Sequence, residues 1–219
     1  MNPLTQFKKN SGERAETYKM KKNRSILMAA LVSAVLLSMT AGALPVYGQA
    51  QAVRWDIIHR DTTTTPPTLS AGGVAFASAS NPNSLTIQLT GSGTFVAPAG
   101  GGTSAAVTGG GTWETFSDGT STGSGTYRVT SLASWNFANL QSGRLIDLID
   151  DGTRANGNAV LRIDYSDGSN GILGVGCHGP GAPDGIVEGV IATKAFVTYW
   201  TSQPPVPGVD ADRTLFHVR

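Results

Sequence analysis

Apolar and polar residues alternate with a period of two along much of the chain, which is typical of strands buried on one face. In residues 85–90, Leu85, Ile87 and Leu89 would share one face of an extended strand, while threonine and glutamine would occupy the other. Residues 160–165 alternate in the same way. Amphipathic helical periodicity is rare by comparison, so strands are the predicted default.

Turn-forming residues such as Asn81-Pro82-Asn83 and Asp118-Gly119 separate further segments of this kind. About nine to ten short, mainly antiparallel strands at this spacing predict one all-β domain, either a sandwich or a barrel. Only residues 142–150 have leucine and isoleucine at helical spacing, so at most one short helix is expected, and it is expected there. The other candidate strands cover residues 53–59, 73–78, 91–97, 112–116, 125–131, 133–137, 171–177, 186–200 and 213–218.

The pattern Gly-x-Gly-Thr-aromatic occurs three times and ends at Phe95, Trp113 and Tyr127, at intervals of 18 and 14 residues. Glycine leaves bare backbone in a strand, and an aromatic ring on the neighbouring strand can cover that backbone. The spacing therefore predicts adjacent hairpin strands with the three rings in the core. The functional alternative is that Phe95, Trp113 and Tyr127 form a platform on which a sugar or another flat ligand stacks.

The first fifty residues contain a cationic segment that begins at Met20 and is followed by an uncharged apolar run, as in a secretory signal peptide. Translation could begin at Met20, because the preceding residues are unusually polar for such a signal. Cleavage is expected near residues 50–52, which leaves residues 51–219 as a single secreted, periplasmic or cell-surface domain. The alternative is an uncleaved anchor, since residues 26–46 approach the length of a membrane-spanning helix.

Removal of residues 1–50 changes the charge, because seven of the sixteen basic residues and only two of the fifteen acidic ones lie there. The remaining domain would carry nine basic and thirteen acidic side chains. This mildly acidic balance argues against nucleic acid and against an anionic membrane surface as partners, since both are bound by basic patches.

Few residues offer metal or nucleophile chemistry. His59, His178 and His217 could hold a transition metal if the first and last strands pair and bring two imidazoles together; otherwise each is an isolated histidine. Cys177 lies in an apolar strand and is expected to be buried, with His178 pointing to the opposite face. The odd cysteine cannot form an internal disulfide.

Other motifs have ordinary structural explanations. Residues 119–123 match the Gly-x-Ser-x-Gly elbow of hydrolases, but strands and a turn surround them, whereas that elbow requires a following helix. Asp147, Asp150 and Asp151 could bind calcium weakly, although aspartate before glycine is first of all a turn signal.

The sequence contains no specific catalytic signature, and none of its motifs belongs to a known family. The leading hypothesis is a non-catalytic exported β domain that binds a ligand such as a carbohydrate, or that contributes to the cell surface or matrix. The alternative is a secreted hydrolytic enzyme that uses a metal on the three histidines, or the carboxylates of Glu114 and Glu188.

Overall fold

A computed structural model describes residues 49–79, 85–203 and 213–219 of the 219-residue chain. The predicted signal segment lies outside these residues up to position 48, as does the predicted turn at 81–83, and both stay predictions. The part from Gln49 to Arg219 is one compact unit. Its described residues contain fourteen strands and no helix, which confirms the predicted all-β class.

The strands are β1 (Gln51–Asp61), β2 (Thr68–Ala71), β3 (Ala75–Ser78), β4 (Leu85–Leu89), β5 (Ser92–Ala97), β6 (Val107–Ser117) and β7 (Thr120–Leu140). They continue with β8 (Ile146–Asp147), β9 (Thr153–Tyr165), β10 (Asn170–Cys177), β11 (Gly189–Lys194), β12 (Val197–Tyr199), β13 (Thr201–Ser202) and β14 (Thr214–Val218). All pairs are antiparallel except that of β2 with β8.

Six strands close a ring, which makes the core of the fold a barrel. In order these are β9, β14, β1, β5, β6 and β7, and β7 pairs again with β9. In the register of the first and last strands, Val53 lies opposite Val218 and Ile57 opposite Thr214, which confirms that the terminal strands pair. Closure leaves no unpaired edge on these six strands.

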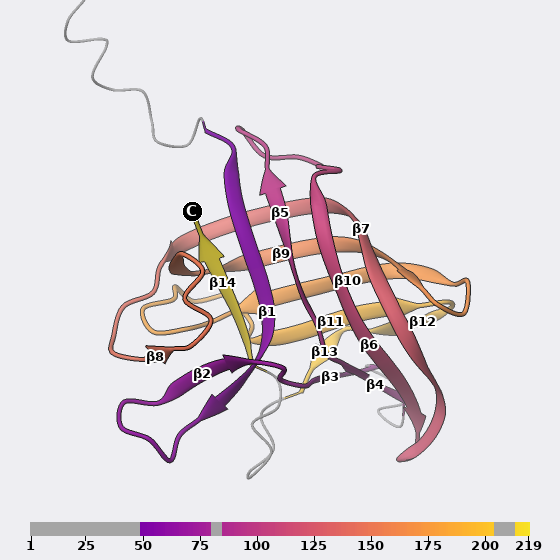
Figure 1. Cartoon of the computed structure of the whole chain (residues 1–219). Coiled ribbons are helices and arrows are strands. Elements are labelled where there is room, and N and C mark those ends of the chain that lie inside the picture. The colour runs from indigo at the N-terminus through magenta and orange to yellow at the C-terminus, as the bar shows by residue number, and fades with distance from the viewer. Residues whose placement is uncertain (1–48, 80–84, 204–212) are drawn as a thin grey trace, which may run out of the picture. The chain divides into compact units, whose positions relative to one another are not determined.

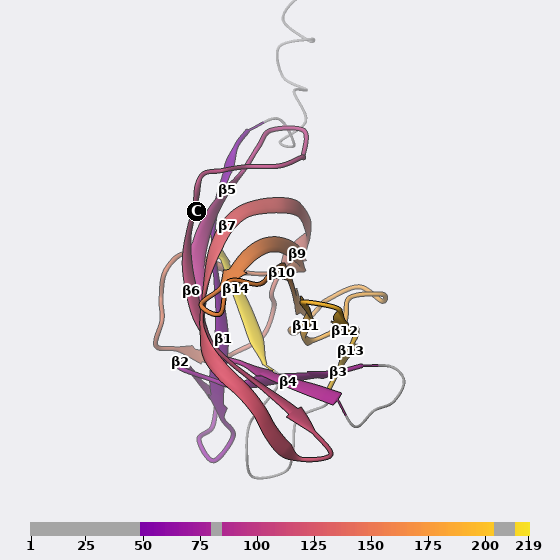
Figure 2. The ribbon, with the colours of Figure 1, turned by 90° about the vertical axis from the view of Figure 1, so that its right-hand side faces the viewer.

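Two further sets of strands extend the barrel. Strands β10, β11 and β12 continue from β9, and β4, β3 and β13 continue from β6. Only Trp200 separates β12 from β13, so the two extensions are joined at that residue. Figure 1 shows β1, β5 and β6 crossing steeply over β9, β10 and β11, and Figure 2 shows β7 arching from one layer to the other.

Residues 125–131 and 133–137 form one strand, β7, rather than two. Its register with β9 shifts at three places, so bulges bend the strand around the barrel without ending it. The helix predicted at residues 142–150 is wrong. Two backbone N–H groups of this segment, at Ile146 and Leu148, donate to carbonyls of Pro67 and Leu69 in and beside β2, which leaves them unavailable for helical bonds.

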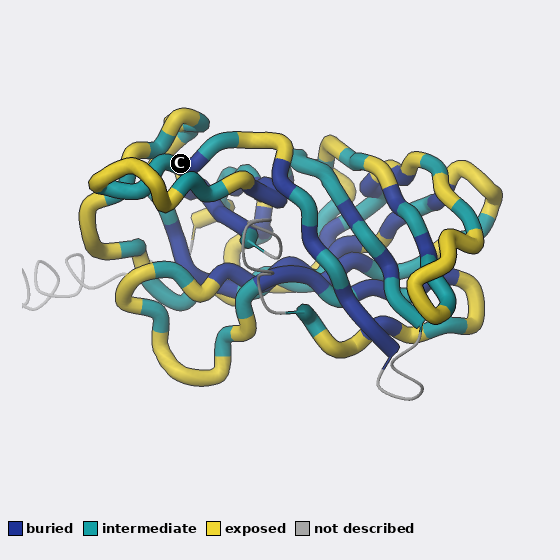
Figure 3. Tube along the Cα trace, turned by 90° about the horizontal axis from the view of Figure 1, so that it is seen from below, coloured by how far each residue is buried: buried dark blue, intermediate teal, exposed yellow. Residues whose placement is uncertain are grey.

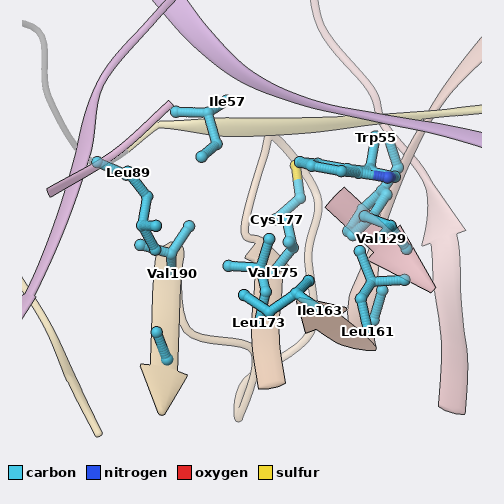
Figure 4. Packing of buried hydrophobic residues seen from close by; sticks show 14 of the residues in the cluster. Trp55, Ile57, Leu89, Val129, Leu161, Ile163, Leu173, Val175, Cys177 and Val190 are labelled. Carbon is cyan, nitrogen blue, oxygen red and sulfur yellow. The ribbon is translucent and has the colours of Figure 1, made fainter. Parts of the chain in front are cut away.

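The core lies between the two layers. Trp55 and Ile57 project from β1 toward Ile163, Leu173 and Val175 on the opposite layer, and all five are almost fully buried (Figure 4). Exposed residues concentrate in the connections between strands (Figure 3). Full burial of each large apolar side chain contributes about 1.5–3 kcal/mol, so this interior is the main stabilising element of the domain.

The three Gly-x-Gly-Thr-aromatic segments lie on adjacent strands, as predicted. Trp113 on β6 faces Gly125 on β7 in register, and Tyr127 on β7 faces Gly111 on β6. These two rings thus lie opposite a glycine on the neighbouring strand, whereas Phe95 on β5 lies opposite Val53 on β1 and Val107 on β6. The Tyr127 hydroxyl reaches beyond Gly111 and donates to the carbonyl of Thr90 at 2.8 Å.

Candidate functional site

A cavity of about 480 Å³ opens beside the last residues of β10, and we call it the end cavity. It draws on segments far apart in the sequence: β1, β2, the 141–145 connection, the loop after β10, and β14. Its main apolar lining consists of Ile58, Leu69, Leu145, Cys177, Pro180 and Leu215. Its polar side chains are Arg60, Gln141, His178, Glu188, Arg213 and Thr214.

Glu188 ties the loop after β10 to the last strand. Its Oε1 accepts the backbone N–H of Thr214 at 2.8 Å, and its Oε2 accepts the backbone N–H of His178. Burial raises the pKa of Glu188, while the two N–H donors and the charge of Arg213 act in the opposite direction. Both oxygens are engaged by backbone donors, so Glu188 shapes the cavity wall rather than presenting a free general acid or base.

The loop that contains His178 is held on several sides. His178 Nδ1 lies 2.7 Å from the Ile186 carbonyl, so Nδ1 carries the proton and Nε2 is left as an acceptor in the neutral ring. The backbone N–H of Gly179 donates to Asn156 Oδ1 at 2.8 Å, and the fully buried Asn156 donates in turn to Asn139. These bonds give the cavity a preformed wall.

Basic residues outnumber acidic ones in the described lining of the end cavity. Arg60 and Arg213 line it, and the Nε of Arg213 is buried without a hydrogen-bond partner among the described residues. Among the described residues of the lining, Glu188 is the one acidic residue, and its oxygens are already occupied. An unsatisfied buried donor in a cavity that a second arginine also lines favours an anionic group on a ligand.

The structure does not bring the three histidines together. His217 lies opposite Arg54 in the β1–β14 register, whereas His59 is five residues farther along β1, beyond the part that pairs with β14. His217 is fully buried and its Nε2 lies 2.7 Å from Asp147 Oδ2, while His178 lies in the end cavity. Within the described ranges, no three His, Cys, Asp or Glu side chains converge to hold a metal ion.

Phe95, Trp113 and Tyr127 are all in the core, with at most 5% of each residue exposed. They therefore present no open face, and the packing alternative describes them. Trp113 instead lies under the ammonium group of Lys194, 4.0 Å from the ring centroid. Burial raises the pKa of the Tyr127 hydroxyl, which keeps it protonated as a donor to Thr90.

The remaining candidates have structural roles. Glu114 lies on β6, opposite Ser124 and Gln88, and is not part of the end cavity with Glu188. The Gly-x-Ser-x-Gly match at residues 119–123 forms the β6–β7 turn and the start of β7, so no helix follows it. Asp147 accepts the backbone N–H groups of Ile149 and Asp150, which is turn chemistry.

Cys177 is buried, as the sequence predicts, with 1% of the residue exposed. Its Sγ lies 3.1 Å from Gln141 Nε2 and 3.2 Å from the Thr214 carbonyl. Burial, together with the nearby charge of Glu188, raises the pKa of the thiol well above its ordinary value. The thiolate is the reactive form, so the geometry describes an inert cysteine.

We therefore expect Cys177 in the folded domain to resist a thiol reagent such as Ellman's reagent at neutral pH. In denaturant the same thiol should react at the rate of a free cysteine, which supplies the internal control. Rapid labelling of the native domain would show that the wall of the end cavity opens readily around Cys177.

The sequence did not predict the end cavity, because its polar members are separated by up to about 150 residues. His178 and Glu188 were candidates for other sites, whereas Arg60, Gln141, Arg213 and Thr214 were not predicted as site residues. One usable signal existed. The pairing of the first and last strands, proposed for His59 and His217, also places Arg60 and Arg213 at the same end of the β1–β14 pair. The backbone N–H of Ile58 donates to the Arg213 carbonyl at 3.0 Å, which fixes that neighbourhood.

Fold and cavity together define a β-barrel domain with a preformed pocket at one end. Comparison of the chain with protein-family models, curated proteins and solved structures finds no match to any of them. In the part of the chain that the structure describes, no helix is long and apolar enough to cross a membrane.

Proposed function

We propose that the domain is an exported binding module that holds a small ligand in the end cavity, and that the ligand combines an anionic group with an apolar body. The observation that carries the proposal is the buried Nε of Arg213, which has no hydrogen-bond partner among the described residues, in a cavity of about 480 Å³ that Arg60 and several apolar side chains also line. Small-molecule sites commonly have volumes of about 300–1,000 Å³ and combine an apolar lining with a few polar groups.

A binding role fits the chemistry of the lining better than hydrolysis does. Glu188 is the one carboxylate that the described residues contribute to the lining, and backbone donors occupy both of its oxygens. Hydrolysis by paired carboxylates needs a second carboxyl group across the substrate. The export of the module rests on the predicted signal peptide.

Calorimetric titration tests the proposal with straight-chain and aromatic carboxylates, each paired with its neutral amide. We expect a subset of the carboxylates to bind and their amides to bind at least about tenfold more weakly, as the loss of a charge-assisted hydrogen bond implies. Arg213→Gln should weaken carboxylate binding by a similar factor.

Arg162→Gln is the matched control, because Arg162 is exposed on β9 and does not line the end cavity. It should leave carboxylate binding unchanged. Equal binding of acids and amides, or full binding by the Arg213→Gln variant, would overturn the proposal.

A further inference from the structure

A second concavity of about 290 Å³ lies on the outer face of β9, β10 and β11, and we call it the outer groove. Ala159, Val175 and Val190 point from these strands into the core, so their neighbours in sequence point outward into the groove. Across the three strands, Val160, Gly174 and Ile191 lie in one row, and Asn158, Gly176 and Gly189 lie in the next.

Gly176 allows the chain before β11 to cross directly over β10. A Cβ atom at position 176 would lie 2.1 Å from the carbonyl oxygen of Val187 and 2.8 Å from Asn158 Oδ1. The close approach places Val187, which is 65% exposed, at the groove. Trp200, at the junction of β12 and β13, also lines the groove and is 51% exposed.

The described lining of the groove has open hydrogen-bonding groups but no charged side chain. The side-chain amide of Asn158 and the indole N–H of Trp200 make no hydrogen bond to any residue in the described ranges. None of the lining residues that the structure describes is acidic, basic or histidine. A complementary ligand is therefore uncharged, and it needs a flat apolar face for the indole together with hydroxyl groups for the amide.

We propose that the outer groove is a binding site for a neutral saccharide, with Trp200 as the stacking residue and Asn158 as the hydrogen-bonding residue. A pyranose ring has an apolar face of C–H groups and a rim of hydroxyls, which is the combination that the groove requires. The electron-rich face of an indole attracts such C–H groups. The groove volume lies at the lower end of small-molecule sites, which suits one or two sugar rings.

The outer groove and the end cavity share none of their lining residues, so this site is independent of the proposed anion site. The exposed aromatic surface could alternatively dock on lipid, and the test distinguishes the two. It uses the whole domain with neutral hexasaccharides of β-1,4-glucose, β-1,3-glucose and β-1,4-mannose. An oligogalacturonate serves as the acidic counterpart, and phosphatidylcholine vesicles serve as the lipid probe.

We expect at least one neutral hexasaccharide to bind and to protect Trp200 from acrylamide quenching, while the oligogalacturonate and the vesicles do not bind. Trp200→Ala should weaken saccharide binding by at least about tenfold, as is usual for a central aromatic anchor. Asn158→Ala should weaken saccharide binding less. Phe196→Ala is the matched control, because Phe196 is fully exposed in the turn after β11 and lies outside the groove.

Binding should survive in the Phe196→Ala variant. Three outcomes would each overturn the proposal. They are failure of all neutral saccharides to bind, saccharide binding by Trp200→Ala equal to that of the parent protein, and Trp200-dependent binding to vesicles in place of saccharides. An unfolded Trp200→Ala variant would be recognised by circular dichroism, and Trp200→Phe then serves as the replacement. It keeps a smaller stacking ring and should bind with intermediate affinity.

Discussion

Replacement of Gly111 by alanine is expected to destabilise the domain by about 3 kcal/mol, the upper end of the usual cost of overpacking. A Cβ atom at position 111 would lie 1.9 Å from the carbonyl oxygen of Thr90, which is a backbone atom and cannot rotate away. The same carbonyl accepts the hydroxyl of the buried Tyr127, so displacement of Thr90 also breaks that hydrogen bond. Urea unfolding followed by tryptophan fluorescence measures the loss.

Gly123→Ala provides the matched control on the next strand. Its Cβ would meet no atom closer than the Trp113 ring at 3.5 Å, an ordinary van der Waals contact. We expect a change within about 0.5 kcal/mol of the parent protein. If Gly111→Ala were as stable as Gly123→Ala, the corner between β4 and β5 would not be packed against β6 as the structure has it.

Gly111 and Gly123 show which consequences of the Gly-x-Gly-Thr-aromatic repeat could be predicted from the sequence and which could not. The pattern predicted adjacent strands with glycine beside an aromatic ring, and the register of Trp113 with Gly125 follows it. It could not distinguish Gly111, which another segment approaches, from Gly123, which nothing crowds. That difference arises from the link between β4 and β5, a contact between residues distant in sequence.

The rest of the fold likewise has features that the sequence predicts and features that it does not. The alternation of apolar and polar residues predicted most strands, because a strand that is buried on one face has an apolar residue at every second position. The helix expected at residues 142–150 failed because leucine and isoleucine at helical spacing also suit an extended segment that packs beside β2. Closure of the ring depends on bends in β7 that no local pattern specifies.

The candidate sites were less predictable than the strands. Alternation alone left Trp113 and Tyr127 as either core residues or a ligand platform. Their burial in the structure assigns them to the core. Trp200 was not predicted as a site residue, because it falls within the predicted strand 186–200. The predicted strand is interrupted at this residue, because β12 pairs with β11 whereas β13 pairs with β3. Trp200 lies between the two pieces and is therefore exposed.

Lys194 on β11 is a charged residue in an almost fully buried position, with 8% of the residue exposed. Its Nζ lies 4.0 Å from the centroid of Trp113 and 4.6 Å from that of Tyr165. It forms an ion pair with Asp167 and a hydrogen bond with Ser169 Oγ at 2.9 Å. The hydrogen bond from Lys194, followed by that from Ser169, lowers the pKa of Asp167 to about 2.

Asp167→Asn should therefore destabilise the domain at neutral pH, because it leaves the Lys194 ammonium in the interior without its counter-charge. Removal of one partner of a fully buried pair costs about 3–5 kcal/mol. Because the Asp167 side chain is 43% exposed, solvent screens the pair, and we expect a loss of about 2 kcal/mol. Lys194→Met removes the buried charge itself, so its loss should be smaller, and adding Asp167→Asn to it should cost little more.

The pH dependence gives a second, independent measurement of the same pair. The folded pKa of Asp167 is about 2 and lies below the ordinary unfolded value of about 3.9, so its contribution is complete above the unfolded value. That contribution is lost as the pH falls from about 4 toward about 2. The difference in unfolding free energy between the parent protein and Asp167→Asn should therefore shrink over this range, whatever the other carboxylates contribute. A difference that stays constant from neutral pH to about pH 2 would show that Asp167 and Lys194 do not interact in the folded domain.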